Sequence, residues 1–401
     1  MTPATAQTST SPTSNPKSAS GRPSVGIIGG GQLARMLAQS ATSLGCDIRV
    51  VESDPDCPAA SVSAELIEGS TSDLETLRKL AAQCDVVTLE NEFIDSRLLA
   101  ALESEGHIVR PTAATMEKVQ DKLVQKEALE AAGLAVPAFR AVNSPADVAV
   151  AAESLGWPLV LKKRRNGYDG KGNATVRSAD EIADAWVKLD GETCDLYVEQ
   201  FCPFTAELAI IITRSAAGES VAYPLVTTVQ KDHICHVVSV PAEVGPDLAA
   251  QAEAMARQAI TAMGGIGSFG VEMFLLADGQ VLINELAPRV HNSGHYTIEG
   301  TICSQFENHI RAVMGWPLGS TELRAPAVVM VNLLGHGEGQ GSPTGLEAAL
   351  SVPGAHLHLY GKALSKRGRK MGHITALGAT VAEALATARS AADSLQFGTP
   401  S

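Results

Sequence analysis

Apolar runs and helical patterns alternate along the first part of the chain. Residues 25–28, 47–51 and 85–89 are short apolar runs of the kind that form buried parallel strands, and a helical pattern of apolar residues follows the first of them. Strands that alternate with helices build a parallel sheet with helices on both faces. We therefore expect a doubly wound α/β domain over residues 24–115, preceded by a polar, disordered tail over residues 1–23.

The pattern changes to mixed helices and strands after residue 116. A helix is expected at residues 116–132, where it ends before Gly133, and another at residues 247–263. Between and after these helices lie apolar runs that are typical of strands. The expected strands cover residues 159–162, 196–200, 206–213, 221–229 and 269–284. We expect an α+β region over residues 116–320.

The last part of the chain is set apart by Pro317 and Pro326. It holds two short apolar runs at residues 328–333 and 356–360, followed by an alanine-rich helical pattern. We expect a small β-rich domain over residues 325–390.

Charge and cysteine usage narrow the class of protein. The 401 residues carry a formal net charge of −13, which argues against a general nucleic-acid binder. No apolar run approaches the roughly 20 residues of a membrane span. Residues 1–23 lack the apolar core of a secretory signal, and their shortage of arginine opposes a transit peptide. The seven cysteines show no C-x-x-C spacing, which favours reduced thiols in the cytoplasm.

Two glutamates are predicted to face each other across a β-hairpin. Asp278 and Gly279 separate two apolar strands and form a strong hairpin signal. If these two residues are the whole loop, Phe274 faces Ile283 and Glu272 faces Glu285. Like charges at facing positions destabilise a sheet, and a bound Mg²⁺ would offset that cost. The alternatives are that one glutamate is protonated or that the nearby Arg289 neutralises both.

A run rich in lysine, arginine and glycine follows the strand predicted at residues 159–162. It contains Lys162, Lys163, Arg164, Arg165, Gly167, Gly170, Lys171 and Gly172. Glycines allow backbone N–H groups to approach phosphate oxygens, and the cations supply charge. The run lacks the Walker pattern, so we interpret it as a flexible cover over a triphosphate. An ordinary basic β-turn is the alternative.

Two further segments carry candidate chemistry. The pattern Gly29-x-Gly31-x-x-Ala34, with Glu52 after the next strand, is similar to a dinucleotide fingerprint and indicates NAD or another phosphate ligand at the start of a helix. A tight turn without a ligand is the alternative. Residues 284–295 are dense in polar groups next to the candidate metal strand, which is more typical of a site than of a solvent loop.

Several of these segments together resemble one family. Their order is that of the ATP-grasp carboxylating ligases, and the match narrows to the N5-carboxyaminoimidazole ribonucleotide synthetases. The matching segments are residues 29–33 (GGGQL), 166–172 (NGYDGKG), 198–201 (VEQF), 284–289 (NELAPR), 291–299 (HNSGHYTIE), 304–308 (SQFEN) and 368–373 (GRKMGH). The resemblance implies an N-terminal α/β pre-ATP-grasp domain, a central ATP-grasp domain with a lid at about residues 135–200, and a small C-terminal domain.

The activity implied by this resemblance is an ATP-dependent ligation. Bicarbonate and 5-aminoimidazole ribonucleotide would give the N5-carbamate, ADP and phosphate through carboxyphosphate, a step of purine biosynthesis. The family also implies a cytoplasmic homodimer. The rival interpretations are a formate-dependent glycinamide ribonucleotide transformylase, a biotin carboxylase subunit, an NAD-dependent oxidoreductase and a non-catalytic ATP-binding regulator.

The resemblance also assigns roles to residues. It implies Mg²⁺ at Glu272 and Glu285. It implies ATP contacts for Lys122, Lys162, Gly167, Gly170, Gly172, Glu199, Gln200, Phe201, Glu207, Asn284 and Glu285. It places bicarbonate and the aminoimidazole beside Tyr168, Asp169, Lys171, Arg289, His291 and Lys370, with Asp169 as a candidate to orient or deprotonate the amine. It assigns the ribonucleotide phosphate to Gly30, Gly31, Gln32 and Leu33. Lys171 stands where the family often has arginine, which would bind a carboxylate in a bidentate manner.

Overall fold

The N-terminal part of the chain is a parallel sheet covered by helices. The computed structural model describes residues 21–167 and 172–399. A four-stranded parallel sheet has the order β3-β2-β1-β4, and α1 follows β1 directly. One strand, β3, was not predicted, because it is half-exposed and lies at the edge of the sheet. The elements of this part are β1 (Ser24–Ile28), α1 (Gln32–Ser43), β2 (Asp47–Glu52), η1 (Ala60–Val62), β3 (Glu65–Glu68), α2 (Leu74–Ala82), β4 (Val86–Leu89) and α3 (Ser96–Ser104).

The helix expected at residues 116–132 is two helices, so that prediction was wrong in its interior. α4 (Ala113–Gln120) and α5 (Lys122–Ala131) meet at Asp121, which has extended backbone angles. The Asp121 carboxylate accepts hydrogen bonds from two backbone N–H groups at the start of α5. The same carboxylate holds the Arg164 guanidinium through two bonds of 3.0 and 2.6 Å. A capped break therefore joins α5 to the strand that leads into the basic loop.

Loss of the Asp121 carboxylate should be destabilising. An Asp121→Ala variant is expected to lose about 2 kcal/mol of unfolding free energy, because it removes a helix cap and one partner of a charged pair. Asp121→Asn keeps the cap and is expected to lose about half as much. Urea unfolding followed by circular dichroism checks both values. Equal losses in the two variants would show that the cap contributes nothing.

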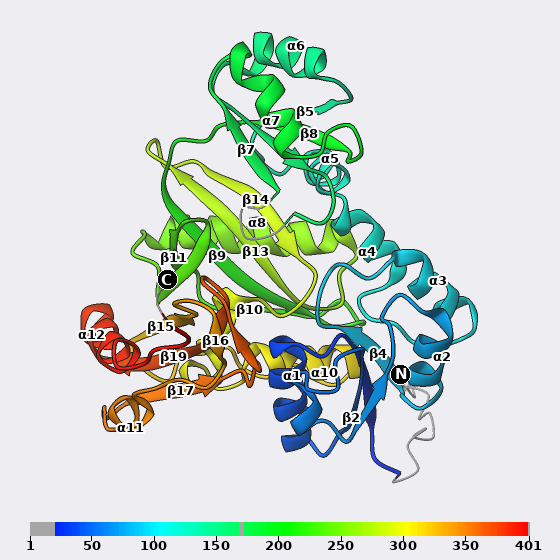
Figure 1. Ribbon diagram of the computed structural model, residues 1–401, viewed down its shortest axis with the longest axis vertical. Helices are drawn as coiled ribbons and strands as arrows, with labels where there is room; N and C mark the ends of the chain where they lie inside the picture. The colour runs from blue at the N-terminus through cyan, green and yellow to red at the C-terminus, as the bar shows by residue number, and fades with distance from the viewer. Residues whose placement is uncertain (1–20, 168–171, 400–401) are drawn as a thin grey trace, which may run out of the picture.

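A second, antiparallel sheet forms the separate upper part of the molecule in Figure 1. Its four strands have the order β5-β8-β6-β7, and two helices pack on one side of it around a core of apolar residues. The basic loop predicted to cover a triphosphate connects β6 to β7, and residues 168–171 of that loop lie outside the described residues. The elements are β5 (Phe139–Val142), α6 (Pro145–Leu155), β6 (Leu159–Lys163), β7 (Asn173–Val176), η2 (Ala179–Glu181), α7 (Ile182–Lys188) and β8 (Leu196–Gln200).

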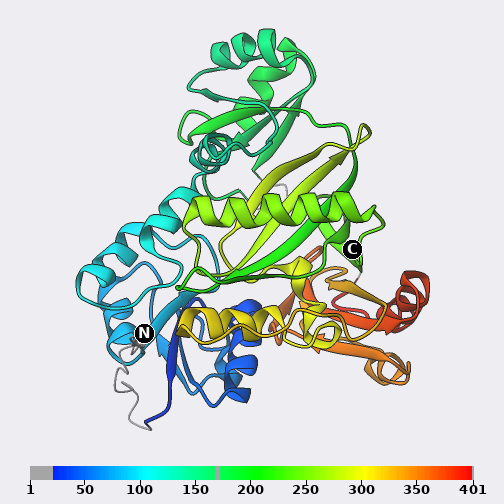
Figure 2. The ribbon, with the colours of Figure 1, turned by 180° about the vertical axis from the view of Figure 1, so that it is seen from behind.

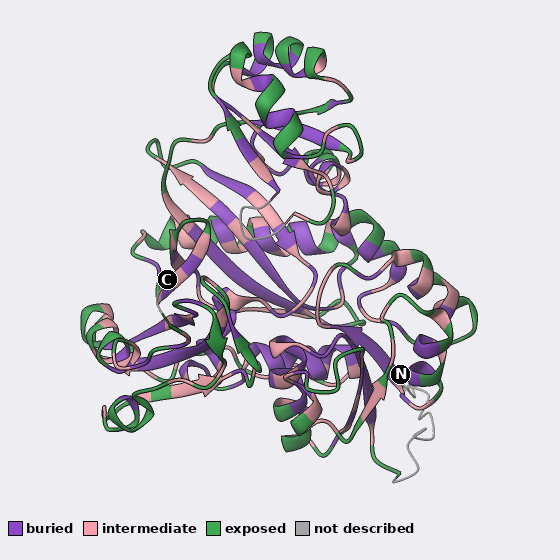
Figure 3. Cartoon of the chain, viewed as in Figure 1, coloured by how far each residue is buried: buried purple, intermediate pink, exposed green. Residues whose placement is uncertain are grey.

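A nine-stranded sheet forms the centre of the molecule, and Figure 3 shows its strands mostly buried, whereas the outer faces of the helices around it are more exposed. The strand expected at residues 221–229 is in fact two strands, β10 and β11, which both pair with β9. Figure 2 shows α8 lying across the back of this sheet. The elements are β9 (Phe204–Arg214), β10 (Ser220–Ala222), β11 (Val226–Lys231), β12 (Ile234–Val240), α8 (Pro246–Met263), β13 (Gly267–Leu276) and β14 (Val281–Ala287).

The C-terminal segment continues the central sheet. β15 pairs with β12 along four residue positions and with β19 on its other side. The sheet therefore runs without interruption as β14-β13-β9-β11-β12-β15-β19-β17. α10 packs against α1 of the N-terminal part. The remaining elements are η3 (Asn292–Gly294), α9 (Thr297–Gly300), α10 (Gln305–Met314), β15 (Ala327–Leu334), β16 (Gly339–Gln340), α11 (Leu346–Leu350), β17 (Ala355–Leu359), β18 (Leu364–Ser365), β19 (Lys370–Gly378) and α12 (Val381–Ala392). Across the described residues, no helix has the length and hydropathy to cross a bilayer.

Candidate active site

A cavity of about 1170 Å³ lies where the three parts of the molecule meet. Residues from the glycine turn, the antiparallel sheet, the central hairpin and the loop before β19 all line it. The predicted site residues in its wall are Gln32, Leu33, Lys122, Lys162, Gly167, Gly172, Glu199, Gln200, Phe201, Glu207, Glu272, Asn284, Glu285, Arg289, His291 and Lys370. Gly30 and Gly31 are not in that wall. Tyr168, Asp169, Gly170 and Lys171 lie outside the described residues.

The two glutamates face each other, although the hairpin differs from the expected one. Glu272 pairs directly with Glu285, whereas Phe274 faces Leu282 and not Ile283. The Leu276 N–H donates to the Gln280 carbonyl at 2.9 Å and closes a three-residue loop, which shifts the register by one position. A bulge at Asn284 shifts it back before Glu285 is reached. The prediction for Phe274 was therefore wrong, and the prediction for the glutamates held because two deviations compensate.

The pKa values of the two facing glutamates are shifted in opposite directions. Burial and the neighbouring Glu285 raise the pKa of Glu272 to about 7. Burial acts in the same direction on Glu285, but the Lys122 ammonium group, whose Nζ lies 2.5 Å from Glu285 Oε2, lowers the pKa of Glu285 below its usual value. His291 Nε2 lies 3.4 Å from Glu272 Oε1. Burial, followed by Arg289, lowers the pKa of His291 to about 3, so this imidazole is neutral near pH 7.

The residues around the glutamate pair fit a magnesium ion. The Oδ1 atom of Asn284 is buried and has no hydrogen-bond partner among the described residues, although a buried amide oxygen normally has one. It belongs to the bulge residue beside Glu285, in the wall of the same cavity. Two carboxylates and an amide oxygen are ligands that suit Mg²⁺ together with phosphate oxygens.

A buried ionic network lies in the wall contributed by the antiparallel sheet. Lys162 Nζ is 2.6 Å from Glu199 Oε2, and Lys126 Nζ is 3.1 Å from Glu199 Oε1. The Tyr197 hydroxyl donates to Glu199 Oε1 at 2.9 Å. Lys126 was not predicted as a site residue. Its position four residues after Lys122 places both lysines on one face of α5, and that spacing was the available signal.

The two described ends of the basic loop lie against each other. A Cβ atom built on Gly172 would lie 2.6 Å from the Cα atom of Gly167, which is closer than a side chain can approach. The Lys163 N–H also donates to the Gly172 carbonyl at 2.9 Å. Glycine is therefore required at this point for the close approach of the two backbone segments.

The glycine turn before α1 is surrounded by carboxylates. The Gly30 N–H donates to Glu52 at 3.1 Å, and the Ala34 N–H donates to Glu90 at 3.0 Å. A Cβ atom on Gly31 would lie 2.1 Å from Glu90 Oε1, so the acidic side chain fills the space beside that glycine. Two of the N–H groups that could bind a phosphate at this helix start therefore already have acidic partners.

Glu90 should make the stability of the protein depend on pH. Burial raises the pKa of Glu90 to about 7, and the Ala34 hydrogen bond only partly opposes this. Its folded-state pKa lies above the unfolded value. The contribution of Glu90 to the unfolding free energy is therefore lost as pH rises toward and through 7. Glu90→Gln is expected to be about 1–2 kcal/mol more stable than the parent chain at about pH 8, with a much smaller difference at about pH 5. Urea unfolding at both pH values measures this, and a constant difference would contradict it.

A basic loop that was not predicted as a whole closes the far wall of the cavity. Only Lys370 was singled out, but four more cations between β17 and β19 line the same wall: Lys362, Lys366, Arg367 and Arg369. The density of lysine and arginine in residues 362–370 was the signal. Near this wall, Arg289 binds both carboxylate oxygens of Glu92, which follows β4.

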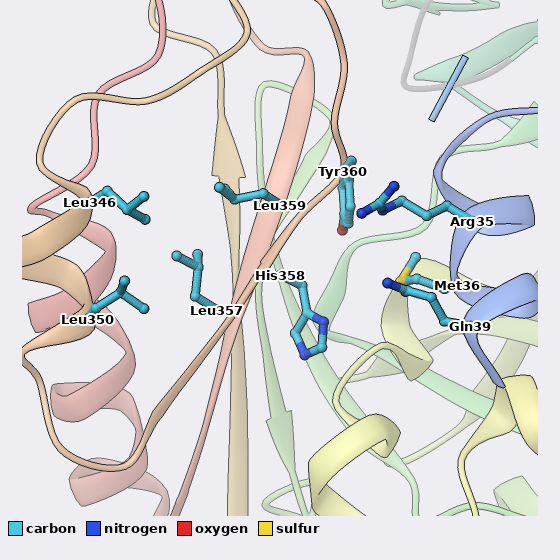
Figure 4. A pocket seen from close by; sticks show the side chains of 9 residues that line it. All are labelled: Arg35, Met36, Gln39, Leu346, Leu350, Leu357, His358, Leu359 and Tyr360. Atoms are coloured by element: carbon cyan, nitrogen blue, oxygen red, sulfur yellow. The ribbon is translucent and has the colours of Figure 1, made fainter. Parts of the chain in front are cut away.

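A smaller hollow of about 370 Å³ lies between α1 and β17. Figure 4 shows four leucines on one side of it and Arg35, Gln39 and Tyr360 toward the other. None of the predicted site residues lines this hollow. The candidate chemistry of the described residues is thus concentrated in the larger cavity.

Family models match three consecutive parts of the chain. They are the ribonucleotide synthetase preATP-grasp domain at residues 23–120, the ATP-grasp domain at residues 127–306, and the phosphoribosylaminoimidazole carboxylase C-terminal domain at residues 328–387. The N5-carboxyaminoimidazole ribonucleotide synthase of Mycobacterium tuberculosis is 41% identical over 387 residues, which cover 94% of this chain and 88% of that protein. The chain belongs to the N5-carboxyaminoimidazole ribonucleotide synthase family.

Solved structures agree with this assignment to the synthase family. The synthase of Aspergillus clavatus complexed with ATP has a TM-score of 0.85 and 40% sequence identity, and the match covers 93% of this chain and 98% of that one. The synthase of the same organism in complex with ADP and 5-aminoimidazole ribonucleotide also has a TM-score of 0.85, at 39% identity, with coverage of 93% and 98%. The expected ATP-grasp fold with its N-terminal and C-terminal additions is confirmed, and the chain is an ATP-grasp ligase.

Proposed function

We propose that this chain uses ATP to carboxylate 5-aminoimidazole ribonucleotide with bicarbonate, giving N5-carboxyaminoimidazole ribonucleotide, ADP and phosphate in purine biosynthesis. The observation that carries this proposal is the pair Glu272 and Glu285, which face each other in the cavity beside the unpaired Asn284 Oδ1. Membership of the synthase family supplies the substrates. Mg²⁺ would be held by these three residues, and when bound it neutralises phosphate charge.

The nucleotide is placed between the hairpin and the antiparallel sheet. Lys122, beside Glu285, and Lys162, beside Glu199, would contact the phosphates. The loop that carries Gly167, Gly170 and Gly172 would cover them. Gln200 and Phe201 would border the adenine, and Glu207 would hold the ribose. Phe201 is 41% exposed in the cavity wall, so it is accessible for stacking on a base. Glu199 supports Lys162 through its carboxylate.

The carboxylation step would take place between the hairpin and the basic loop. Transfer of the γ-phosphoryl group of ATP to a bicarbonate oxygen would give carboxyphosphate and release ADP. Transfer of its carbon dioxide unit to the amine would then give the carbamate and release inorganic phosphate and the amine proton. Arg289 and Lys370 would bind the anionic groups, and neutral His291 would donate or accept a hydrogen bond. Tyr168, Asp169 and Lys171 are assigned to the loop that excludes water from the labile intermediate, with Asp169 next to the amine.

The phosphate of the ribonucleotide has two candidate positions. The first is the glycine turn, where Gln32 and Leu33 reach the cavity but Glu52 and Glu90 add negative charge near Gly30 and Gly31. The second is the wall formed by Lys366, Arg367, Arg369 and their neighbours. Cations favour a phosphate and carboxylates oppose it, so we favour the second position.

The domain boundaries, the oligomeric state and the location in the cell are part of the same proposal. Domains are placed at residues 24–115, 116–320 and 325–390, with a lid at about residues 135–200 that contains the antiparallel sheet. We further propose a homodimer in the cytoplasm. Sedimentation velocity at micromolar concentration tests the dimer, because a monomer would contradict it directly.

An ADP-release assay tests the activity. Purified chain, Mg²⁺ and ATP are combined with 5-aminoimidazole ribonucleotide, with and without bicarbonate in carbon-dioxide-depleted buffer. ADP release is expected to require both substrates. Formate in place of bicarbonate is the matched control and is expected to give no stimulation. Stimulation by formate and glycinamide ribonucleotide, or ADP release that needs no aminoimidazole, would contradict the proposed reaction.

A further inference from the structure

A lysine outside the cavity shares a carboxylate with a lysine inside it. Lys162 lines the cavity, whereas Lys126 is 1% exposed and lies behind the wall on α5. Both ammonium groups meet Glu199, Lys162 at Oε2 and Lys126 at Oε1, at 2.6 and 3.1 Å. Each oxygen of the Glu199 carboxylate therefore contacts a different lysine, one that lines the cavity and one that does not.

The charges of this network leave a surplus of one positive charge. Two ammonium groups and one carboxylate sum to +1. Burial lowers the pKa of Lys126, and the Glu199 carboxylate opposes that shift. Burial acts to raise the pKa of Glu199, but Lys126 and Lys162 lower it to about 2, so the carboxylate is ionised at neutral pH. Without Lys126, Glu199 would balance Lys162 completely, and the remaining hydrogen bond from the Tyr197 hydroxyl is neutral. The surplus charge that faces the cavity thus depends on Lys126.

We propose that Lys126 is a positioning residue for the nucleotide. It occupies one oxygen of Glu199 so that Lys162 retains a net positive charge toward the phosphates. This proposal rests on the proposed function, in which Lys162 contacts ATP. Electrostatic attraction is strong in such a buried wall, so the loss of one positive charge from the network that includes Lys162 should lower the affinity for a polyphosphate.

A purely structural role for Lys126 predicts something different. Lys126 Nζ also lies 3.3 Å from the Ile283 carbonyl oxygen, which ties α5 to the hairpin strand β14. If this tie were the whole role, any removal of the ammonium group would loosen the hairpin regardless of the charge of Glu199. A variant that removes Lys126 and also neutralises Glu199 separates the two roles.

The test compares four variants of the full chain. Lys126→Met removes the buried positive charge, which brings the formal charge of the network to zero. Lys126→Met combined with Glu199→Gln restores it to +1, because only Lys162 stays charged. Lys118→Met, on the exposed face of α4, removes the same charge from the surface as a matched control. Tyr197→Phe removes a neutral partner of the same Glu199 oxygen. Calorimetry with Mg²⁺ and ADP measures affinity without the other substrates, and circular dichroism checks folding.

The expected results follow the charge of the network. Lys126→Met should weaken ADP binding by about tenfold, a loss that the double variant largely recovers. In ADP-release assays the KM for ATP should rise while kcat changes less. Lys118→Met should bind as the parent chain does, and Tyr197→Phe should lose only about threefold.

Other outcomes would overturn the inference. The inference would be overturned if a folded Lys126→Met variant bound ADP as tightly as the parent chain. It would also be overturned if the double variant bound ADP no better than Lys126→Met. If Lys126→Met does not fold, the double variant is compared directly with the parent chain, and a tenfold loss there overturns the inference. Failure of the parent chain to bind ADP at all would instead count against the proposed function.

Discussion

Replacing Glu285 with glutamine is expected to slow ADP release by about a hundredfold to a thousandfold, with ATP, bicarbonate and aminoimidazole ribonucleotide at saturation. Glutamine has the shape of glutamate but carries no charge, so it is a weaker ligand for a divalent cation. It also loses the charge that holds Lys122, whose Nζ lies 2.5 Å from Glu285 Oε2. Both effects remove charge neutralisation where phosphoryl transfer needs it. Initial rates measured over a range of Mg²⁺ concentrations check the size of the loss.

The control for this variant is Glu130→Gln, an exposed position on α5. It makes the same chemical change outside the cavity and should retain the parent activity. Glu272→Gln should resemble Glu285→Gln, since both carboxylates belong to the facing pair. Retention of more than about a tenth of the activity in both hairpin variants would contradict a role for this pair in catalysis.

Replacing Arg289 with lysine is expected to lower kcat/KM for aminoimidazole ribonucleotide by about a hundredfold, while the KM for ATP changes little. The Arg289 guanidinium binds Glu92 through two nitrogens, and its third nitrogen donates to the Val290 carbonyl. A lysine ammonium cannot bind Glu92 as a fork and also reach a substrate anion. Steady-state kinetics with each substrate varied in turn provide the measurement.

Arg324→Lys is the matched control for Arg289→Lys. Arg324 also uses two guanidinium nitrogens, but it binds the backbone carbonyls of Thr301 and Ile302 and does not line the cavity. Its replacement should leave kcat/KM for aminoimidazole ribonucleotide unchanged. A loss of less than about threefold in Arg289→Lys would show that bidentate binding at Arg289 is not needed.

Most elements could be predicted from the sequence, because local patterns determine them. The strand before the glycine turn and the long helix α8 follow directly from apolar periodicity. The split at Asp121 could not be predicted in the same way, since the periodicity continues across it. At the split, Asp121 caps α5 and also pairs with Arg164, which lies 43 residues away in the chain. Tertiary contacts of this kind override a local pattern.

The hairpin shows how far the site itself could be predicted. The pairing of Glu272 with Glu285 was correct, but the expected two-residue loop was not. Local sequence does not reveal a bulge such as the one at Asn284, because its position depends on pairing with the neighbouring strand. Lys126 was missed although its spacing from Lys122 was available, because its partner Glu199 is distant in sequence and comes close only after folding.

The continuous sheet has a consequence for how the chain can be divided. Family models separate the ATP-grasp domain from the C-terminal domain between residues 306 and 328. In the structure, however, β15 covers one edge of β12 with backbone hydrogen bonds. A truncation at that boundary would uncover a buried, apolar strand edge, which is a template for aggregation. Boundaries inferred from evolutionary modules therefore do not mark autonomous folding units here, and expression of the isolated central region calls for a replacement strand at that edge.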